Sequence, residues 1–328
     1  MQPDKRSRSQ TPNAQAKTRK RYAIFAIMTV AVIGWGGFLK FGLPLLIPTF
    51  PPANAEITDA LPQAAISQTS KPTYQTYELK NATIHIVALP AGTRLSVAVA
   101  DELKTVEDFA QQEKALAVIN GGFFDPQNGK TTSHLILQGN TVGSPSDNER
   151  LMDNPDLQPY LDRILNRSEF RTYQCRTSSQ TSEMRYEIAA HSDLSPLPNT
   201  CTLVDLIGAG PQLLPEDTSY EEGFTDYKDG KRVRDAIGGA GPNARSAIAL
   251  TADNIILLIM VAQRPDAPGL TLPEVAEFAT SLDAVSLLNL DGGSSSTLYY
   301  NGQTHLGRLD TGGNAIERPV KSVIVVGQ

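Results

Sequence analysis

The chain has few of the residues and motifs that define common enzyme classes. Only two cysteines occur among its 328 residues, with no Cys-x-x-Cys pair and no Cys/His cluster, which disfavours a thiolate zinc site. Residues 122–131 have some features of a phosphate-binding loop, but Phe124 stands where that motif requires glycine. Residues 208–210 lack the third glycine of a dinucleotide fingerprint, and no Gly-x-Ser-x-Gly nucleophile elbow is present.

Acidic charge dominates the part of the chain that follows its first 21 residues. Those residues hold seven Lys or Arg side chains and one acidic residue, Asp4, whereas the whole chain has a net charge of −6. The remainder therefore has a net charge near −12, which disfavours nucleic acid as a partner. Small or neutral substrates suit this part of the chain better, unless a local basic pocket offsets its field.

A long uncharged segment follows the basic tail. Residues 22–39 contain no charged side chain, and only Lys40 interrupts the apolar stretch that continues to Phe50. This length fits a membrane anchor or a signal segment, and the preceding positive charge places the N-terminus in the cytoplasm. Ala53 and Ala55 have the spacing of a signal-peptidase site, so an uncleaved anchor and a cleaved signal both stay open, beside a buried soluble helix.

The sequence thus predicts four segments and a location outside the cytoplasm, periplasmic or extracellular, for most of the chain. They are a basic cytoplasmic tail (1–21), a transmembrane anchor or signal segment (22–50), a Pro-, Ala- and Ser/Thr-rich linker (51–72) and a folded domain (73–328). Cys175 and Cys201 fit export, because a disulfide between them would contribute roughly 3–4 kcal/mol in an oxidising compartment. Two unrelated buried thiols are the alternative.

Apolar periodicity predicts an α+β fold: a mixed, largely antiparallel, twisted β-sheet core with a few packed helices. The expected strands include residues 74–79, 83–89, 95–100, 203–207, 246–250, 255–262, 297–300, 303–306 and 320–326. Helices are expected near residues 106–115, at 156–170, and after a capping box formed by Thr271 and Glu274. The polar stretches 125–200 and 216–241 are interpreted as irregular excursions, the first covering the site with its far end held by the disulfide.

Two passages far apart in the chain have the same form. Residues 117–125 and 284–296 each begin with an apolar run that stops at a polar residue and a glycine pair. Such a strand presents a polar side chain at the edge of a sheet. Asp291, directly after the second run, is the strongest candidate to bind a metal or a sugar hydroxyl, or to act as acid, base or nucleophile. Asp-Gly-Gly is also common turn chemistry, which is the alternative interpretation.

Two further side chains are candidates on their position alone. Arg245 stands at the start of a buried strand, so its guanidinium must be paired or face a cleft, and a structural ion pair is the alternative. His134 follows the first glycine pair and is a weaker candidate for a site, because isolated histidines such as His134 and His305 are more often surface or packing residues.

Six short stretches of the chain occur in a fixed order and together resemble the phosphodiester glycosidase family. No single stretch is specific, but the ordered set is, and it covers about residues 80–328. The matching stretches are residues 120–124, 208–214, 243–249, 269–278, 289–297 and 318–320.

The resemblance implies an exported hydrolase that cuts a glycosidic bond to a phosphate, or an ordinary glycoside in some members. It implies that Asn120, Arg245 and Asp291 line the pocket. An arginine can neutralise the phosphate leaving group, and a carboxylate can act on the anomeric centre or on water. Backbone N–H groups of glycine-rich turns can bind phosphate oxygens, so the expected substrate-binding residues are Gly121, Gly122, Phe123, Gly210, Gly292, Gly293, Ser294 and His134.

A sugar phosphate is a good leaving group, so one carboxylate can suffice. If there is a second carboxylate, we expect it to be Asp125 before Glu149 or Glu317. The sequence requires no cofactor, although a divalent metal such as calcium is compatible with it. The expected substrate is a glycan-phosphate linkage in the cell envelope or in exopolysaccharide, and a non-catalytic envelope glycan-binding protein on the same scaffold is the competing hypothesis.

Overall fold

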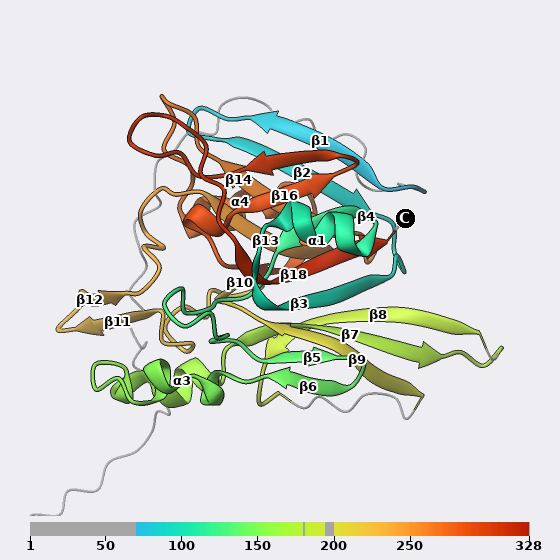
Figure 1. Cartoon of the computed structure of the whole chain (residues 1–328), viewed down its shortest axis with the longest axis horizontal. Helices are drawn as coiled ribbons and strands as arrows, with labels where there is room; N and C mark the ends of the chain where they lie inside the picture. Colours follow the sequence, from blue (N-terminus) through green and yellow to red (C-terminus); the bar gives the residue numbers. More distant parts are fainter. Residues whose placement is uncertain (1–69, 180, 194–199, 328) are drawn as a thin grey trace, which may run out of the picture. The chain divides into compact units, whose positions relative to one another are not determined.

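A computed structural model describes residues 70–179, 181–193 and 200–327 (Figure 1). Three antiparallel sheets dominate these residues. The first has six strands in the spatial order β1 (Thr73–Glu78), β2 (Thr83–Leu89), β14 (Ile256–Ala262), β13 (Arg245–Thr251), β15 (Ala284–Asn289) and β10 (Gln212–Leu214).

The other two sheets have five strands each. The β4 sheet has the order β17 (Gln303–Leu306), β16 (Thr297–Tyr300), β4 (Ala115–Asn120), β18 (Val320–Gly327) and β3 (Leu95–Lys104). The β7 sheet has the order β6 (Asn140–Gly143), β5 (Leu135–Leu137), β9 (Cys201–Gly208), β7 (Ser168–Arg176) and β8 (Ser182–Ala190). A separate hairpin joins β11 (Thr225–Lys228) to β12 (Lys231–Asp235).

Strands buried on both faces explain the continuous apolar runs of the sequence. In β13, Ile248 and Leu250 point into a core shared with side chains of both five-stranded sheets, such as Ile119 and Ile207. Ala247 and Ala249 point to the opposite core, where α4 (Leu272–Thr280) covers the six-stranded sheet with Phe278 and its neighbours. Successive side chains of a strand face opposite sides, so every position of β13 is buried.

The helices are short and lie at the sheet surfaces. The capping box of α4 is confirmed, because the Thr271 hydroxyl accepts from the Glu274 N–H while the Glu274 carboxylate accepts from the Thr271 N–H. Helix α1 (Val106–Glu113) covers the β4 sheet through Phe109. The remaining helical segments are η1 (Pro145–Asp147), α2 (Glu149–Met152), η2 (Gln158–Tyr160), α3 (Leu161–Leu165) and η3 (Gly293–Ser295).

The predicted α+β class with largely antiparallel sheet is confirmed, and most expected strands occur within a few residues of their predicted bounds. The interpretation of residues 125–200 as an irregular excursion is wrong, because they supply the strands β5, β6, β7 and β8 of the β7 sheet (Figure 1). The expected helix over 156–170 is also too long. Only Leu161–Leu165 forms α3, and the chain enters β7 at Ser168, where Phe170 joins the core.

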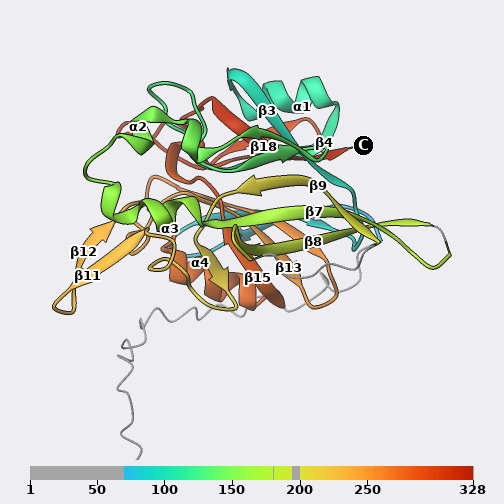
Figure 2. The same cartoon turned by 90° about the horizontal axis from the view of Figure 1, so that it is seen from below.

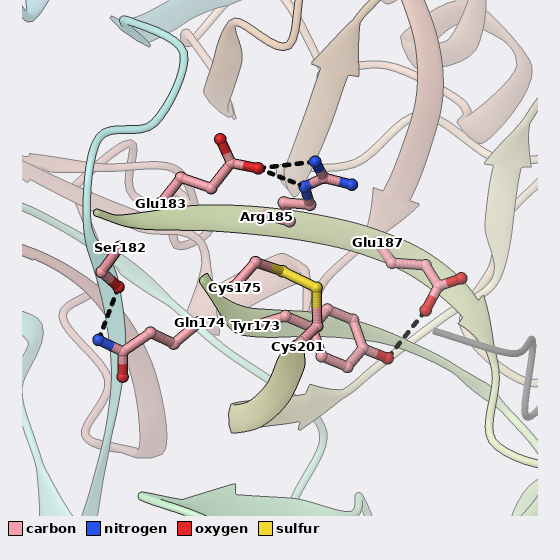
Figure 3. The surroundings of a disulfide bond; sticks show 8 residues. All are labelled: Tyr173, Gln174, Cys175, Ser182, Glu183, Arg185, Glu187 and Cys201. Atoms are coloured by element: carbon pink, nitrogen blue, oxygen red, sulfur yellow. Dashed lines mark hydrogen bonds and ion pairs between the residues drawn. A yellow bond between two sulfur atoms is a disulfide. The ribbon is translucent and has the colours of Figure 1, made fainter. Parts of the chain in front are cut away.

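The predicted disulfide between Cys175 and Cys201 is present, and it joins β7 to β9 (Figure 3). Nearby, the Tyr173 hydroxyl donates to Glu187 over 2.9 Å. The disulfide thus joins two neighbouring inner strands of the β7 sheet and does not hold the end of a loop. Within the described residues no helix is long and apolar enough to cross a membrane, and the expected anchor or signal segment, residues 22–50, lies outside them.

Candidate active site

The two apolar strands that end in glycine pairs belong to different sheets, and their ends meet. The Asp291 N–H, two residues past β15, donates to the Gly121 carbonyl, one residue past β4, over 2.9 Å. The fully buried Asn120 amide donates to the Asp291 carbonyl over 2.6 Å. Its Oδ1 accepts from the Ser246 hydroxyl (2.6 Å) and the Thr297 N–H (3.1 Å). Asn120 therefore fixes the backbone that carries Asp291.

The turn between β9 and β10 reaches the same place. The Gly210 N–H donates to the Asn289 carbonyl over 2.9 Å, and the Asn289 side chain donates to the Gly210 carbonyl over 2.7 Å. The Asn289 N–H donates to the Pro211 carbonyl over 3.0 Å. Strands from all three sheets thus converge on the segment 289–293.

A small pocket opens at this convergence, with a volume of about 140 Å³. This is below the roughly 300–1,000 Å³ of a pocket that encloses a drug-sized ligand, so it suits one sugar-sized end of a larger molecule. Its lining consists of Phe123, Ile237, Asn243, Arg245, Asn289, Asp291, Gly292 and Gly293.

A larger open groove of about 510 Å³ lies between residues 263–268 and 309–313. Its charged groups are committed to local contacts. Asp310 accepts hydrogen bonds from the N–H groups of Gly312 and Asn314, and Arg264 pairs with Glu78. The smaller pocket is the better candidate site, because it contains a carboxylate and a guanidinium from separate strands.

Asp291 is the only carboxylate that lines the small pocket. Burial raises the pKa of Asp291 from 3.8 to about 6, while the Ser295 hydroxyl, the charge of Arg318 and the Gly292 N–H oppose the change. A carboxyl group with this pKa is mainly ionised at neutral pH and still binds a proton more readily than an exposed aspartate. It is therefore suited to act as a base or a nucleophile.

Arg245 is buried and binds backbone carbonyls. Its Nε donates to Leu270 (3.1 Å), its Nη1 to Ile237 (3.2 Å), and its Nη2 to Gly238 (2.7 Å) and Gly241 (2.8 Å). Four of its five N–H groups are used, which leaves one at Nη1. The ion pairs found among the described residues do not include Arg245, so the structural ion pair considered for this residue is absent there.

Burial also lowers the pKa of Arg245 to about 10, with Asp235 opposing the change and Arg308 adding to it. Arg245 therefore stays charged at neutral pH. Arg308 donates to the Asn243 side-chain oxygen, and Arg318 donates to the Ser294 hydroxyl over 2.9 Å. Arg245 thus lines the pocket, Arg308 binds the lining residue Asn243, and Arg318 acts on the charge of Asp291.

Two amide groups of the lining keep hydrogen-bonding capacity. Asn243 Nδ2 and Asn289 Oδ1 have no partner among the described residues, and neither is a buried unpaired atom. The lining thus includes a free donor at Asn243 and a free acceptor at Asn289, and Arg245 retains one N–H without a partner in the described chain. Phe123 and Ile237 add apolar surface. This mixture is suited to a sugar, which has both hydroxyl groups and apolar ring faces.

A match to a protein-family model shows the family of this chain. Residues 113–327 match the model of the phosphodiester glycosidase family, a span that contains the whole lining of the pocket. The chain belongs to this family. A sequence search among curated proteins gave no match.

Two solved structures have a fold similar to that of this chain. The catalytic domain of zebrafish N-acetylglucosamine-1-phosphodiester alpha-N-acetylglucosaminidase, auto-inhibited by its pro-peptide, is similar with a TM-score of 0.54 and 19% identity. That match covers 81% of this chain and 87% of the zebrafish chain. A protein from Burkholderia pseudomallei K96243 has a TM-score of 0.52 at 15% identity, covering 75% of this chain and 74% of its own. At these identities the likeness shows the fold alone.

The pocket of this phosphodiester glycosidase family member brings together five of the residues expected at the site. These are Phe123, Arg245, Asp291, Gly292 and Gly293. Asn120 lies behind the pocket and contacts the backbone of Asp291.

The glycine pair after β4 is explained by close packing within the chain. A Cβ at Gly121 would lie 2.3 Å from Ile207 Cδ1, and one at Gly122 would lie 2.1 Å from the Gly208 carbonyl oxygen. Gly210 has φ +111°, and a Cβ there would lie 2.0 Å from the Glu222 carboxylate. None of the three lines the pocket, so the structure gives them a packing role.

Other expected residues lie outside the pocket lining. Asp125 pairs with Arg150 over 2.7 Å, and Glu149 pairs with Lys130. Ser294 accepts from Arg318, and Glu317 is exposed.

His134 also lies outside the pocket lining. Its Nε2 lies 3.0 Å from the Leu165 carbonyl, and its ring stacks on His191 with 3.6 Å between centroids. The lining residues that sequence reasoning missed are Ile237, Asn243 and Asn289. Asn243 and Asn289 stand inside the family-like stretches, two residues before Arg245 and Asp291, which was the available signal.

Within the described part of the chain, no three His, Cys, Asp or Glu side chains converge in a way that could hold a metal ion.

Proposed function

We propose that this chain is a glycosidase that hydrolyses the bond between the anomeric carbon of a sugar and a phosphate oxygen, in a phosphodiester of cell-envelope glycan or exopolysaccharide. A related glycoside is the secondary substrate. The observation that carries the proposal is the pocket that combines the Asp291 carboxylate with the buried cation Arg245, in a chain of the phosphodiester glycosidase family.

Each group has a role that its surroundings support. The ionised Asp291 either attacks the anomeric carbon or removes a proton from the attacking water. The C–O bond to phosphate breaks, the phosphate monoester departs with the bonding electron pair, and water supplies the hydroxyl group of the sugar. Arg245 stabilises the negative charge of the departing phosphate through its remaining N–H, with Arg308 and Arg318 nearby.

The leaving group explains how one carboxylate can serve. A phosphate monoester departs as a stable anion, so the reaction needs no strong general acid. Because the active form of Asp291 is the ionised one, we expect kcat/KM to rise with pH through about 6 and then level off.

Export is part of the proposal. It is supported by the disulfide between Cys175 and Cys201, which persists in oxidising compartments, and by the basic tail followed by an uncharged segment in the sequence. The membrane-anchored and secreted forms both leave the catalytic part outside the cytoplasm.

The test is sugar release from a panel of p-nitrophenyl glycosides and sugar-1-phosphodiesters by the purified full-length protein. Asp291→Asn should reduce kcat/KM by at least about a hundredfold, because it removes the reacting charge. Asp253→Asn, a change at an exposed turn residue, is the matched control and should keep full activity. If folded wild-type protein releases sugar from none of these compounds, the result favours the glycan-binding alternative.

A further inference from the structure

A second group of cations lies next to the pocket. It consists of Arg163 in α3, Arg167 just after α3, and Arg234 in β12. The hairpin β11–β12 and α3 lie side by side at the same end of the described part in both views (Figures 1 and 2). None of the three arginines takes part in an ion pair with another described residue. Their charges are therefore not neutralised by a direct carboxylate partner.

Aromatic rings hold these guanidinium groups in place. The distances from Cζ to the ring centre are 3.8 Å for Arg167 over Phe224, 4.3 Å for Arg234 over Tyr160, and 4.6 Å for Arg163 over Tyr220. Stacking occupies one face of a guanidinium and leaves its edge of N–H donors free to bind a ligand.

Most of the donors in this cluster are unused. Arg167 Nε donates to the Glu222 carbonyl (3.2 Å), and Arg234 Nε donates to the Gly223 carbonyl (2.8 Å). The terminal nitrogens of all three arginines have no hydrogen-bond partner among the described residues, and none of them is a buried unpaired atom. These half-buried arginines thus retain N–H donors for a ligand.

Phe123 connects this cluster to the pocket. Phe123 lines the pocket, and the centre of its ring lies 5.7 Å from Arg167 Cζ. Burial, with a further contribution from the charge of Arg234, lowers the pKa of Arg167 to about 10, while Glu222 opposes the change. Arg167 therefore remains a cation at neutral pH, and Arg234 lies near enough for its charge to act on Arg167.

The positive charge of this cluster contrasts with the acidic net charge of the rest of the chain. The part that follows the basic tail has a net charge near −12, and this charge would repel a polyanion. A local group of unpaired arginines beside the pocket offsets that repulsion where the substrate would lie. The planar guanidinium edge also matches the geometry of phosphate oxygens.

We propose that Arg163, Arg167 and Arg234 form an anion subsite that binds a phosphate group of the same glycan, one repeat away from the bond that is cleaved. The preferred substrate class is then a polymer with several phosphodiesters, and single sugar-1-phosphodiesters are weaker substrates. This inference rests on the proposed function, and its test separates the two.

The kinetic test compares a compound with one phosphodiester and a two-repeat compound with two. In the full-length protein, Arg163→Gln/Arg234→Gln should raise the KM for the two-repeat compound relative to the one-phosphate compound by about tenfold, the effect of losing a charge-assisted hydrogen bond. Arg185→Gln removes an exposed arginine of β8 that pairs with Glu183 (Figure 3), and should leave that ratio unchanged. An unchanged ratio in the double variant overturns the subsite.

A binding test does not depend on turnover. Calorimetry on Asp291→Asn, with and without Arg163→Gln/Arg234→Gln, uses the two-repeat compound and, in parallel, inorganic phosphate. Weaker binding of the two-repeat compound in the arginine variant supports the subsite, even if wild-type protein hydrolyses nothing and the proposed function fails. Equal binding in both backgrounds overturns the subsite. Equal affinity for inorganic phosphate and the two-repeat compound overturns the assignment to a glycan.

Discussion

Replacing Asp291 with asparagine should stabilise the folded protein while it removes activity. Burial raises the pKa of this carboxyl group from 3.8 to about 6, so the folded state disfavours its ionised form. Each pKa unit corresponds to about 1.4 kcal/mol, which gives an upper limit of about 3 kcal/mol for the destabilisation by the charge. Asparagine keeps the shape of the side chain without the charge, and we expect a gain of about 2–3 kcal/mol at neutral pH.

The sign of this effect depends on pH. Because the folded pKa is raised, the protonated form of Asp291 is compatible with the fold, and stability is lost as pH rises from about 4 to about 6. Below about 4 the carboxyl group is protonated in both states, so the asparagine variant should gain nothing there. Above about 6 the gain should be complete and constant.

Urea unfolding of the full-length protein, with its disulfide intact, measures the free energy of unfolding at pH 4 and pH 7.5. Asp253→Asn is the control, and this exposed change should stay within about 0.5 kcal/mol of wild type at both pH values. Our account of Asp291 is refuted if its asparagine variant gains no stability at pH 7.5, or gains the same amount at pH 4.

Two further predictions concern the scaffold. Gly122→Ala places a Cβ 2.1 Å from the Gly208 carbonyl oxygen and should lower the free energy of unfolding by about 3 kcal/mol or more in the urea assay. Gly327→Ala is the control, because a Cβ at Gly327 lies in open space and should change this free energy little. The double variant Cys175→Ser/Cys201→Ser should lower the free energy of unfolding by about 3–4 kcal/mol, because the unfolded chain is no longer closed into a loop, and it should retain kcat/KM. An unchanged free energy of unfolding would contradict this.

Local signals made much of the fold predictable from sequence. β14 is a continuous apolar run because both of its faces are buried, and such a run leaves little choice of structure. The start of α4 is fixed by a capping box, and the hairpin of β16 and β17 by Asn301 and Gly302, which both have positive φ. Each of these signals lies within a few residues of the element that it defines.

Four of the five strands of the β7 sheet were missed because their sequence pattern is ambiguous, whereas β9 was expected over residues 203–207. β8 is half-exposed along most of its length and carries charged side chains, so it resembles a polar loop. In β7 the buried Glu169 and Arg171 pair with each other over 2.7 Å, and two charges in a core strand contradict the apolar pattern expected there. The leucine spacing before Ser168 also fits a helix longer than α3.

The site was predictable only in part, for a related reason. Asp291 and Arg245 stand beside buried strands, and a polar residue at such a position is visible in one sequence. Whether a side chain then enters the pocket depends on partners from distant segments. Asn120 has the same sequence context as Asp291, but its amide oxygen accepts hydrogen bonds from the Ser246 hydroxyl and the Thr297 N–H. No local sequence pattern reveals these partners.

Backbone carbonyls, and not a carboxylate, accommodate the buried charge of Arg245. Its four hydrogen bonds run to Leu270, Ile237, Gly238 and Gly241, while Asp235 acts on it only at longer range. Carbonyl dipoles satisfy the N–H donors and leave the net charge of the guanidinium uncompensated, whereas a paired carboxylate would cancel it. The pocket thus keeps a fixed positive charge in a rigid position. Such a cation needs no rearrangement when negative charge develops on a leaving phosphate. Preorganised sites stabilise transition states in this way.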